Sequence, residues 1–256
     1  MKRRKYKIML LGFFLMFLGI YLSIPDGKLR LIFCDVGQGD GALIINGNWQ
    51  MLIDVGADNG KMERCLDRYI PFWDKTIEGV MISHWDDDHS GALVKIMNNY
   101  KIEHLFESVE SGEGIEQKIY TEKMRAGDVL KYGKIYFDVL YPRENGEMGN
   151  ESSLVVVLNY LDKRFMFTGD VDSQGEGEVL GWWNSRIDGL KVSHHGSDSG
   201  SSEDWIRRIA PGVAVISVGK NSYGHPKKEI IERFEKLGIK ILRTDELGDV
   251  ILSLEK

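Results

Sequence analysis

The sequence has few residues of the kinds that cross-link or interrupt a chain, with two cysteines and five prolines among 256 residues. Cys34 and Cys65 are too few for a disulfide-built scaffold, and neither belongs to a CxxC pair that would suggest a zinc site. We therefore expect two buried free thiols, even in an oxidising compartment. No repeat or low-complexity tract occurs, and a hydrophobic share of 43% is typical of a globular protein.

Acidic residues are absent from the first seven positions, where five residues are basic, and an apolar run follows from Ile8 to Ile24. This run of 17 residues is at the short end of what spans a bilayer. Because Tyr21 to Pro25 offers a poor cleavage site, we favour an uncleaved signal anchor over a cleaved signal, and both over a buried core helix. Residues 26–256 then lie outside the cell membrane on a single-pass anchor, or are secreted if the leader is cut.

The rest of the chain has no excess of basic residues and carries a net negative charge. The formal net charge of −6 becomes about −11 after Lys7, because five basic side chains precede that point. Bulk charge of this sign argues against avid, sequence-independent binding of nucleic acid. A local basic patch or bound metal ions could still attract phosphates.

Hydrophobic patterns predict one mixed αβ domain over residues 26–256, with no linker that would divide its core. Strands joined by Gly- and Asn-containing turns come first, and strands alternating with helices follow. The predicted strands cover residues 29–35, 41–45, 49–55, 79–83, 102–106, 134–141, 154–160, 164–168, 189–193, 213–218, 239–242 and 249–254. The predicted helices cover residues 61–70, 90–99 and 226–237, with a short helical stretch before residue 189.

Five of the six histidines lie in segments rich in Asp, Gly and Ser. The densest of these segments is His84-Trp85-Asp86-Asp87-Asp88-His89, where a predicted buried strand ends and a helix begins. His84 and Asp86 can reach one cation, while Asp88 and His89 can turn toward a second. Taken alone, the segment is also compatible with a solvated acidic loop or a helix N-cap.

Three further segments carry side chains that suit a metal centre. Asp170 follows a hydrophobic strand and can bridge two metals, although an ordinary Gly-Asp turn explains that fragment better when it is taken alone. After another strand, one imidazole of His194 and His195 can complete a metal shell and the other can contact substrate, with a structural pair as the alternative. His225 precedes a proline suited to the first turn of a helix, and it can meet a phosphate or donate a proton.

In order and spacing, these segments resemble the metallo-β-lactamase superfamily, and more narrowly the extracellular hydrolase domain of ComEC-type competence proteins. The resemblance spans most of the chain. Its motifs are Asp35-Val-Gly-Gln-Gly-Asp40, Ile53-Asp54-Val-Gly56, the segment from His84 to His89, Asn150 with Ser153, Thr168-Gly-Asp170, His194-His-Gly-Ser197 and Tyr223-Gly-His-Pro226. So many matches in one order argue against coincidence.

The resemblance implies an α/β fold, a four-layer αβ/βα sandwich with two divalent metal ions at one edge of its two sheets. The ligands that it implies are His84 and Asp86 on one ion, Asp88, His89 and His194 (rather than His195) on the other, and Asp170 between them. The candidate substrate-binding residues are Asn150, Ser153, His195, Ser197, Tyr223 and His225.

Asp86 stands where the superfamily usually has a second histidine. The site is therefore harder and richer in oxygen than that of a zinc β-lactamase, so manganese becomes a rival to zinc. Because the chain has only one apolar segment, we also expect no DNA-transport channel from this chain alone.

We therefore predict a dinuclear metal-dependent hydrolase of phosphodiesters, either in DNA or in a smaller or cell-wall substrate. A hydroxide bridging the metals would attack phosphorus while the ions stabilise the charge that develops. Asp88 and His225 are the catalytic candidates, with His225 protonating the leaving oxygen or holding a phosphate. A hydrolase of a lactam, lactone or thioester, and a noncatalytic metal-binding module, are the alternatives. No segment indicates a protein partner.

Overall fold

Two seven-stranded sheets form the centre of the computed structural model of the chain, which describes residues 6–7, 9–14, 28–108, 119–143 and 152–254. The strands of the first sheet are β1 (Leu29–Phe33), β2 (Gly41–Asn46), β3 (Trp49–Val55), β4 (Thr76–Ile82), β5 (Lys101–Glu107), β6 (Thr121–Lys123) and β14 (Val250–Leu254). Those of the second sheet are β7 (Val129–Tyr132), β8 (Ile135–Tyr141), β9 (Val155–Tyr160), β10 (Lys163–Phe167), β11 (Gly189–Lys191), β12 (Val213–Ile216) and β13 (Lys240–Arg243). The orders are β14-β1-β2-β3-β4-β5-β6 and β13-β12-β11-β10-β9-β8-β7.

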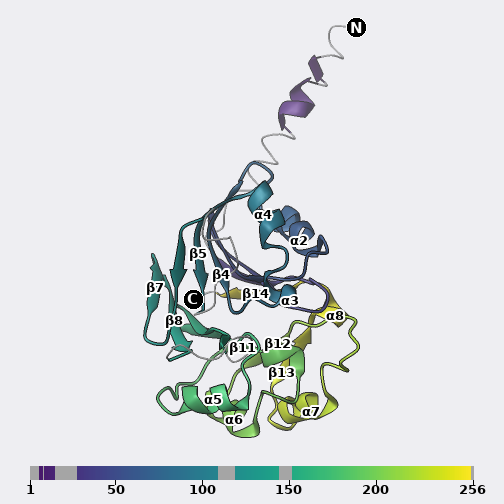
Figure 1. Cartoon of the computed structure of the whole chain (residues 1–256). Helices are drawn as coiled ribbons and strands as arrows, with labels where there is room; N and C mark the ends of the chain where they lie inside the picture. Colours follow the sequence, from purple (N-terminus) through teal and green to yellow (C-terminus); the bar gives the residue numbers. More distant parts are fainter. Residues whose placement is uncertain (1–5, 8, 15–27, 109–118, 144–151, 255–256) are drawn as a thin grey trace.

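Helices cover the outer face of each sheet, as Figure 1 shows. The first sheet carries α2 (Lys61–Tyr69), α3 (Asp87–Ser90) and α4 (Leu93–Asn99). Beside the second lie α5 (Ser173–Leu180), the 3₁₀ turn η2 (Ser193–Gly196), α6 (Glu203–Ile209), α7 (Lys228–Lys236) and α8 (Thr244–Leu247).

Three apolar clusters correspond to the three interfaces of four layers. Alternate residues of a strand point to opposite faces, so a strand covered on both sides is apolar throughout. Met51 of β3 lies in the cluster between the sheets and its neighbour Leu52 in the cluster under α2 and α4. Phe165 and Met166 of β10 divide in the same way between the sheet interface and the cluster under α5, α6 and α7. The predicted αβ/βα sandwich is confirmed.

The predicted helix over residues 90–99 is wrong in its start and its continuity. A first short helix, α3, begins at Asp87, so Asp88 and His89 are helical, and α4 begins only at Leu93. Gly91 lies between them with no room for a side chain, since a Cβ there would stand 2.5 Å from the Asp87 carbonyl oxygen. The strands β6 and β7 and the helix α6 were also absent from the prediction. The two strands are short and mostly exposed, so they lack a hydrophobic pattern.

The expectation of two free thiols is wrong, because Cys34 and Cys65 form a disulfide with their Cα atoms 5.9 Å apart. Cys34 directly follows β1 and Cys65 lies on the buried face of α2, and both belong to the cluster between that helix and the first sheet. A separation of 31 residues hides this proximity from a reading of local patterns.

The predicted membrane span, Ile8–Ile24, lies mostly outside the described residues. Residues 9–14 are described, are helical and expose their apolar side chains, with Leu10 65% accessible. Figure 1 shows them projecting away from the domain. Among the described residues, no helix has the length and apolarity needed to cross a bilayer.

Removing the disulfide, by dithiothreitol or by the double substitution Cys34→Ser/Cys65→Ser, is expected to lower the free energy of unfolding by about 3 kcal/mol. The cross-link restricts the unfolded chain over a sequence separation of 31. Urea unfolding followed by circular dichroism measures the loss, and the double variant serves as the control because reductant should leave it unchanged. Equal stability of the oxidised and reduced chains would contradict the disulfide.

Candidate metal centre

The sequence places acidic and histidine side chains just after apolar strands, and the sheet topology gathers them at one edge. In the first sheet β3 and β4 are parallel, so Asp54 and the segment after Ile82 lie side by side. In the second sheet β10 and β11 are parallel, so Asp170 and the turn at His194 also lie side by side. The edges of the two sheets face each other, and the side chains of both converge between them.

Several buried polar atoms around this edge have no hydrogen-bond partner among the described residues, and four of them lie together: Nε2 of His84, His89 and His195, and Oδ1 of Asp170. The His89 Nε2 atom lies 3.2 Å from Asp170 Oδ1, and His195 Nε2 lies 3.5 Å from Asp170 Oδ2. The rings of His84 and His89 are 4.1 Å apart between centroids. Leaving one buried polar atom unpaired costs about 1–3 kcal/mol. Four such atoms pointing at one place therefore fit divalent cations, which the resemblance to the metallo-β-lactamase superfamily implies.

Contacts on the far side of each ring orient the three buried histidines. The Asp54 carboxylate accepts a hydrogen bond from His89 Nδ1 at 2.9 Å, and the Ser217 carbonyl accepts one from His195 Nδ1 at 2.9 Å. Nδ1 of His84 lies 3.1 Å from Ser83 Oγ. A histidine that donates through Nδ1 presents its Nε2 lone pair, as a metal ligand must.

Asp54 links three elements around the centre. Its carboxylate accepts hydrogen bonds from the Ser83 amide at 2.7 Å, from Ser83 Oγ at 2.8 Å and from His89 Nδ1. Asp54 itself has φ of 55°, a left-handed conformation that is uncommon for a residue with a side chain. Strain of this kind is kept where the surrounding contacts require it.

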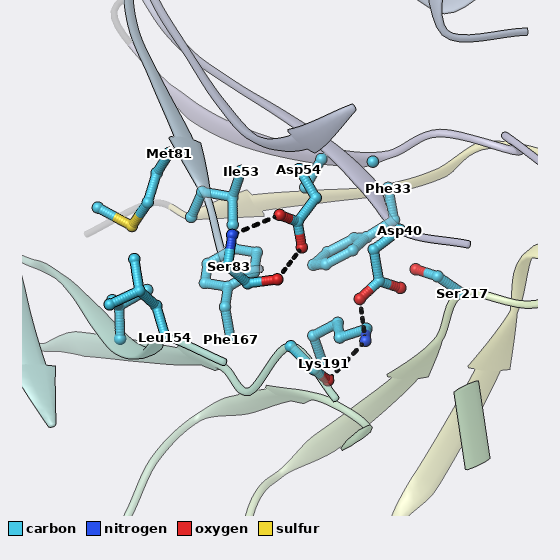
Figure 2. A pocket seen from close by; sticks show the side chains of 14 residues that line it. Phe33, Asp40, Ile53, Asp54, Met81, Ser83, Leu154, Phe167, Lys191 and Ser217 are labelled. Carbon is cyan, nitrogen blue, oxygen red and sulfur yellow. Dashed lines mark hydrogen bonds and ion pairs between the residues drawn. The ribbon is translucent and has the colours of Figure 1, made fainter. Parts of the chain in front are cut away.

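A buried lysine, Lys191, lies behind the centre. Its ammonium group forms an ion pair with Asp40 and donates a hydrogen bond to the Gly169 carbonyl at 3.2 Å. Figure 2 shows Lys191, Asp40, Asp54 and Ser83 around a small cavity of about 10 Å³, roughly the space of one water molecule. Burial opposes ionisation of Asp40, but Lys191 and His195 outweigh it and lower its pKa to about 2.

The charge around the three histidines favours a cation at this place. Burial lowers the pKa of His84 to about 4, so its ring is neutral. Burial opposes the charged form of His89 too, but Asp170 and Asp54 raise its pKa well above the usual value. Asp170 and Asp40 likewise raise the pKa of His195 to about 9 against the effect of burial. The carboxylates thus stabilise positive charge between the sheets.

The other predicted ligands lie at the rim. Asp86 precedes α3, and its Oδ2 is 3.6 Å from His84 Nε2, with the side chain 56% exposed. Asp88 Oδ2 is 3.3 Å from His195 Nε2. The structure therefore brings both carboxylates to the buried histidines.

His194 and His195 take up different positions although they are adjacent. His195 is buried, whereas the side chain of His194 is 27% exposed, with its Nε2 3.6 Å from Asp170 Oδ2 and its Nδ1 3.1 Å from Ser199 Oγ. Both residues have positive φ, 47° and 53°, and this turn directs the two rings apart. Only His195 belongs to groups of described side chains close enough to share one ion.

The predicted substrate-binding residues are only partly gathered. Ser153 is buried, with its Oγ 3.2 Å from His84 Nδ1 and accepting a hydrogen bond from the Asp170 amide. Ser197 is buried beside Ser199, from whose amide it accepts a hydrogen bond. Asn150 lies outside the described residues.

His225 and Tyr223 form the open side of the centre. The His225 ring is 5.6 Å from that of His194, and its Nδ1 is buried without a hydrogen-bond partner among the described residues. Tyr223 stacks on His225 at 5.8 Å and is 67% exposed. An aromatic surface and a polar atom thus border the approach to the buried histidines.

Sequence reasoning missed the supporting residues. Asp40 and Asp54 were named only as parts of motifs, and Ser83, Lys191 and Ser217 were given no role. One signal for Lys191 was present, since it is a charged residue within an apolar segment that leads into His194. The Ser217 contact uses a backbone carbonyl, which no side-chain pattern reveals.

Glu176 of α5 anchors the segment that follows the histidine turn. Its carboxylate is buried and accepts hydrogen bonds from the backbone amides of Ser201 and Ser202. Burial raises the pKa of Glu176 to about 7, and the two serines only partly offset this effect.

The contribution of Glu176 to stability is expected to fall as pH rises from about 4.5, its ordinary pKa, to about 7. The folded protein binds the proton more tightly than the unfolded chain in this range, so the stabilisation is complete at lower pH and lost through the folded-state pKa. Urea unfolding at several pH values, compared between the wild type and Glu176→Ala, measures the contribution of Glu176 to the free energy of unfolding at each pH. A difference between the two proteins that does not change with pH would contradict it.

Comparison with known proteins identifies the class that this fold and site define. Residues 34–220 match the metallo-β-lactamase superfamily. The chain therefore belongs to that superfamily, and with its candidate metal ligands it is a metal-dependent hydrolase of this class.

Within the superfamily, the chain is similar to competence proteins. It is 30% identical over 267 residues to ComE operon protein 3 of Bacillus subtilis, covering 93% of this chain and 34% of that protein. It is 27% identical over 235 residues to competence protein ComA of Neisseria gonorrhoeae, covering 88% of this chain and 32% of that protein. The chain thus spans about a third of the length of these relatives.

Solved structures share the fold at low sequence identity. The metallo-β-lactamase fold protein YhfI from Bacillus subtilis superposes with a TM-score of 0.64 at 11% identity, covering 89% of this chain and all of that one. A diphosphatase of the PhnP family superposes with a TM-score of 0.52 at 12% identity, covering 88% of this chain and 98% of that one. At these identities the likeness shows the fold alone.

Proposed function

We propose that the chain is a phosphodiesterase that uses two divalent metal ions and acts on the outer side of the cell membrane. The observation that carries the proposal is the convergence of four unpaired buried atoms from both sheets, with Asp86 and Asp88 at the rim. The three carboxylates of Asp86, Asp88 and Asp170 offset most of the charge of two divalent ions. The remaining positive potential would attract an anionic substrate.

The donor atoms divide into two sets that share Asp170. We place His84 and Asp86 in one set, and Asp88 and His89 in the other with a residue of the turn at 194–195; Asp88, His89 and His195 lie close enough to share one ion, as do His84, His89 and Asp170. We assign His195 to the second set, in place of the His194 that the family pattern favours, because its Nε2 is buried, unpaired and 3.3 Å from Asp88. The oxygen-rich rim keeps manganese as a rival to zinc.

Bound ions would supply Lewis-acid stabilisation of the phosphoryl oxygens and lower the pKa of water. The chain supplies the remaining functions. Asp54, Ser83 and Ser217 keep the histidines in position. His225, whose Nδ1 has no hydrogen-bond partner in the described part of the chain, donates a proton to the leaving oxygen or holds a phosphate oxygen. Tyr223 offers an exposed aromatic face to the leaving group.

The relatives support the choice of a phosphodiester. One is named a competence protein, which favours DNA as the substrate, and one fold neighbour is named a diphosphatase. The acidic balance of the domain favours a smaller diester instead. DNA and small diesters are therefore the two arms of the test. The apolar run at Ile8–Ile24 supports the location outside the membrane.

Substituting Asp170 by alanine is expected to remove bound metal and to lower phosphodiesterase activity by at least about a hundredfold, since the carboxylate lies between both donor sets. Metal content is measured by mass spectrometry, and turnover with bis(p-nitrophenyl) phosphate, single-stranded DNA and double-stranded DNA, each with zinc or manganese. Asp162→Ala, on the turn before β10, is the matched control.

Three outcomes separate the alternatives in this assay. Unchanged metal content and activity in Asp170→Ala would refute the site. A metal-loaded chain that hydrolyses lactone or lactam but no diester would identify the other hydrolase class. Cleavage of the small diester with both DNA substrates intact would exclude DNA while leaving the mechanism in place.

Substitution of the two adjacent histidines is expected to have unequal effects. His195→Ala should lose one of two bound ions, whereas His194→Ala should retain both, because only His195 presents a buried, unpaired Nε2. Equilibrium dialysis with zinc gives the stoichiometry of each variant. Loss of an ion from His194→Ala alone would restore the original family assignment.

A further inference from the structure

The loop between α2 and β4 exposes two adjacent aromatic side chains. Phe72 is 81% accessible and Trp73 is 55% accessible. Their rings pack edge to face against each other at 4.9 Å between centroids. Large apolar side chains that are exposed together mark a contact surface far more often than single ones do.

This loop lies at the edge of the first sheet where the N-terminal segment enters the domain. Leu29, at the start of β1, pairs with Asn46, and Asn46 pairs with Trp49 at the start of β3. The next strand, β4, runs parallel to β3 and begins at Thr76, directly after the loop. The aromatic pair and the entry point therefore share one edge.

Distances along the chain keep this edge close to the apolar segment. Four residues, 25–28, connect Ile24 to β1, and an extended chain of that length reaches about 14 Å. The starts of β1 and β4 are three strand spacings apart, about 14 Å as well. If residues 8–24 lie in a bilayer, these two lengths keep the loop within about 28 Å of its surface.

The charges beside the aromatic pair suit a bilayer surface. Lys75, two residues after Trp73, lies with its ammonium group over the Tyr100 ring at 4.6 Å, and Lys101, which pairs with Glu103, opens the adjacent strand β5 at the same edge. The nearest acid, Asp74, is engaged within the domain, since its two oxygens accept hydrogen bonds from Gln50 Nε2 and the Thr76 amide. Tryptophan and lysine together are typical of the membrane–water interface.

We propose that Phe72 and Trp73 insert into the headgroup region of the bilayer and hold the domain upright on its anchor. The metal centre lies at the other end of β3 and β4, about 20 Å from this edge along the strands. The contact therefore directs the metal centre away from the lipid. This inference rests on the proposed membrane location, and it adds a contact between the loop and the lipid headgroups.

The full chain, reconstituted in vesicles of phosphatidylcholine and phosphatidylglycerol, tests the contact through tryptophan fluorescence. Lipids brominated near the headgroup end of their acyl chains quench only indoles that reach the interface. Trp73 is one of six tryptophans, so the lipid-dependent quenching is expected to fall several-fold in Trp73→Phe. Trp182→Phe is the matched control, because Trp182 is also exposed, at 41%, but belongs to the second sheet's helical layer.

Flotation of the same vesicles distinguishes the membrane anchor from the lipid contact of Phe72 and Trp73. A chain that floats and loses its quenching in Trp73→Phe but not in Trp182→Phe supports the contact. Floating with equal quenching in the wild type and Trp73→Phe overturns the contact and leaves the anchor in place. Failure to float overturns both.

Discussion

The metal centre depends most on the hydrogen bonds that the Asp54 carboxylate accepts. This carboxylate receives hydrogen bonds from the Ser83 amide and hydroxyl and from His89, so it fixes the end of β4 and the first turn of α3 relative to β3. The same contact sets the direction of the His89 ring. Without a defined ring direction, donors from two separate sheets would not meet at one point.

A different interaction, made by Lys191, connects the second sheet to the metal centre. Lys191 is buried at the end of β11 and contacts Asp40 from the first half of the chain, while its bond to the Gly169 carbonyl supports the turn that carries Asp170. A buried ion pair adds little net stability, but loss of one partner leaves the other charge buried without compensation. The pair therefore connects the end of β11 to Asp40 in a way that neither residue can lose alone.

The sequence predicted the layers, and most of the side chains that it named as ligand candidates lie together between the sheets, because each follows an apolar strand that patterns reveal. It did not predict the disulfide, because Cys34 and Cys65 meet only once α2 has packed on the first sheet. Nor did it separate His194 from His195. Adjacent residues share the same sequence context, and only the left-handed turn buries the ring of His195 and leaves that of His194 partly exposed.

The position of β14 beside β1 has a consequence for how the domain is made. β1 pairs with β14, a strand that follows the whole second sheet in the sequence, and Asp249, just before β14, accepts hydrogen bonds from the Asp35 amide and from Tyr69 of α2. The first sheet therefore cannot be completed until the second sheet has been synthesised. A chain cut before Asp249 would leave β1 as the exposed edge of the first sheet and would free Asp35, at the start of the motif that reaches Asp40.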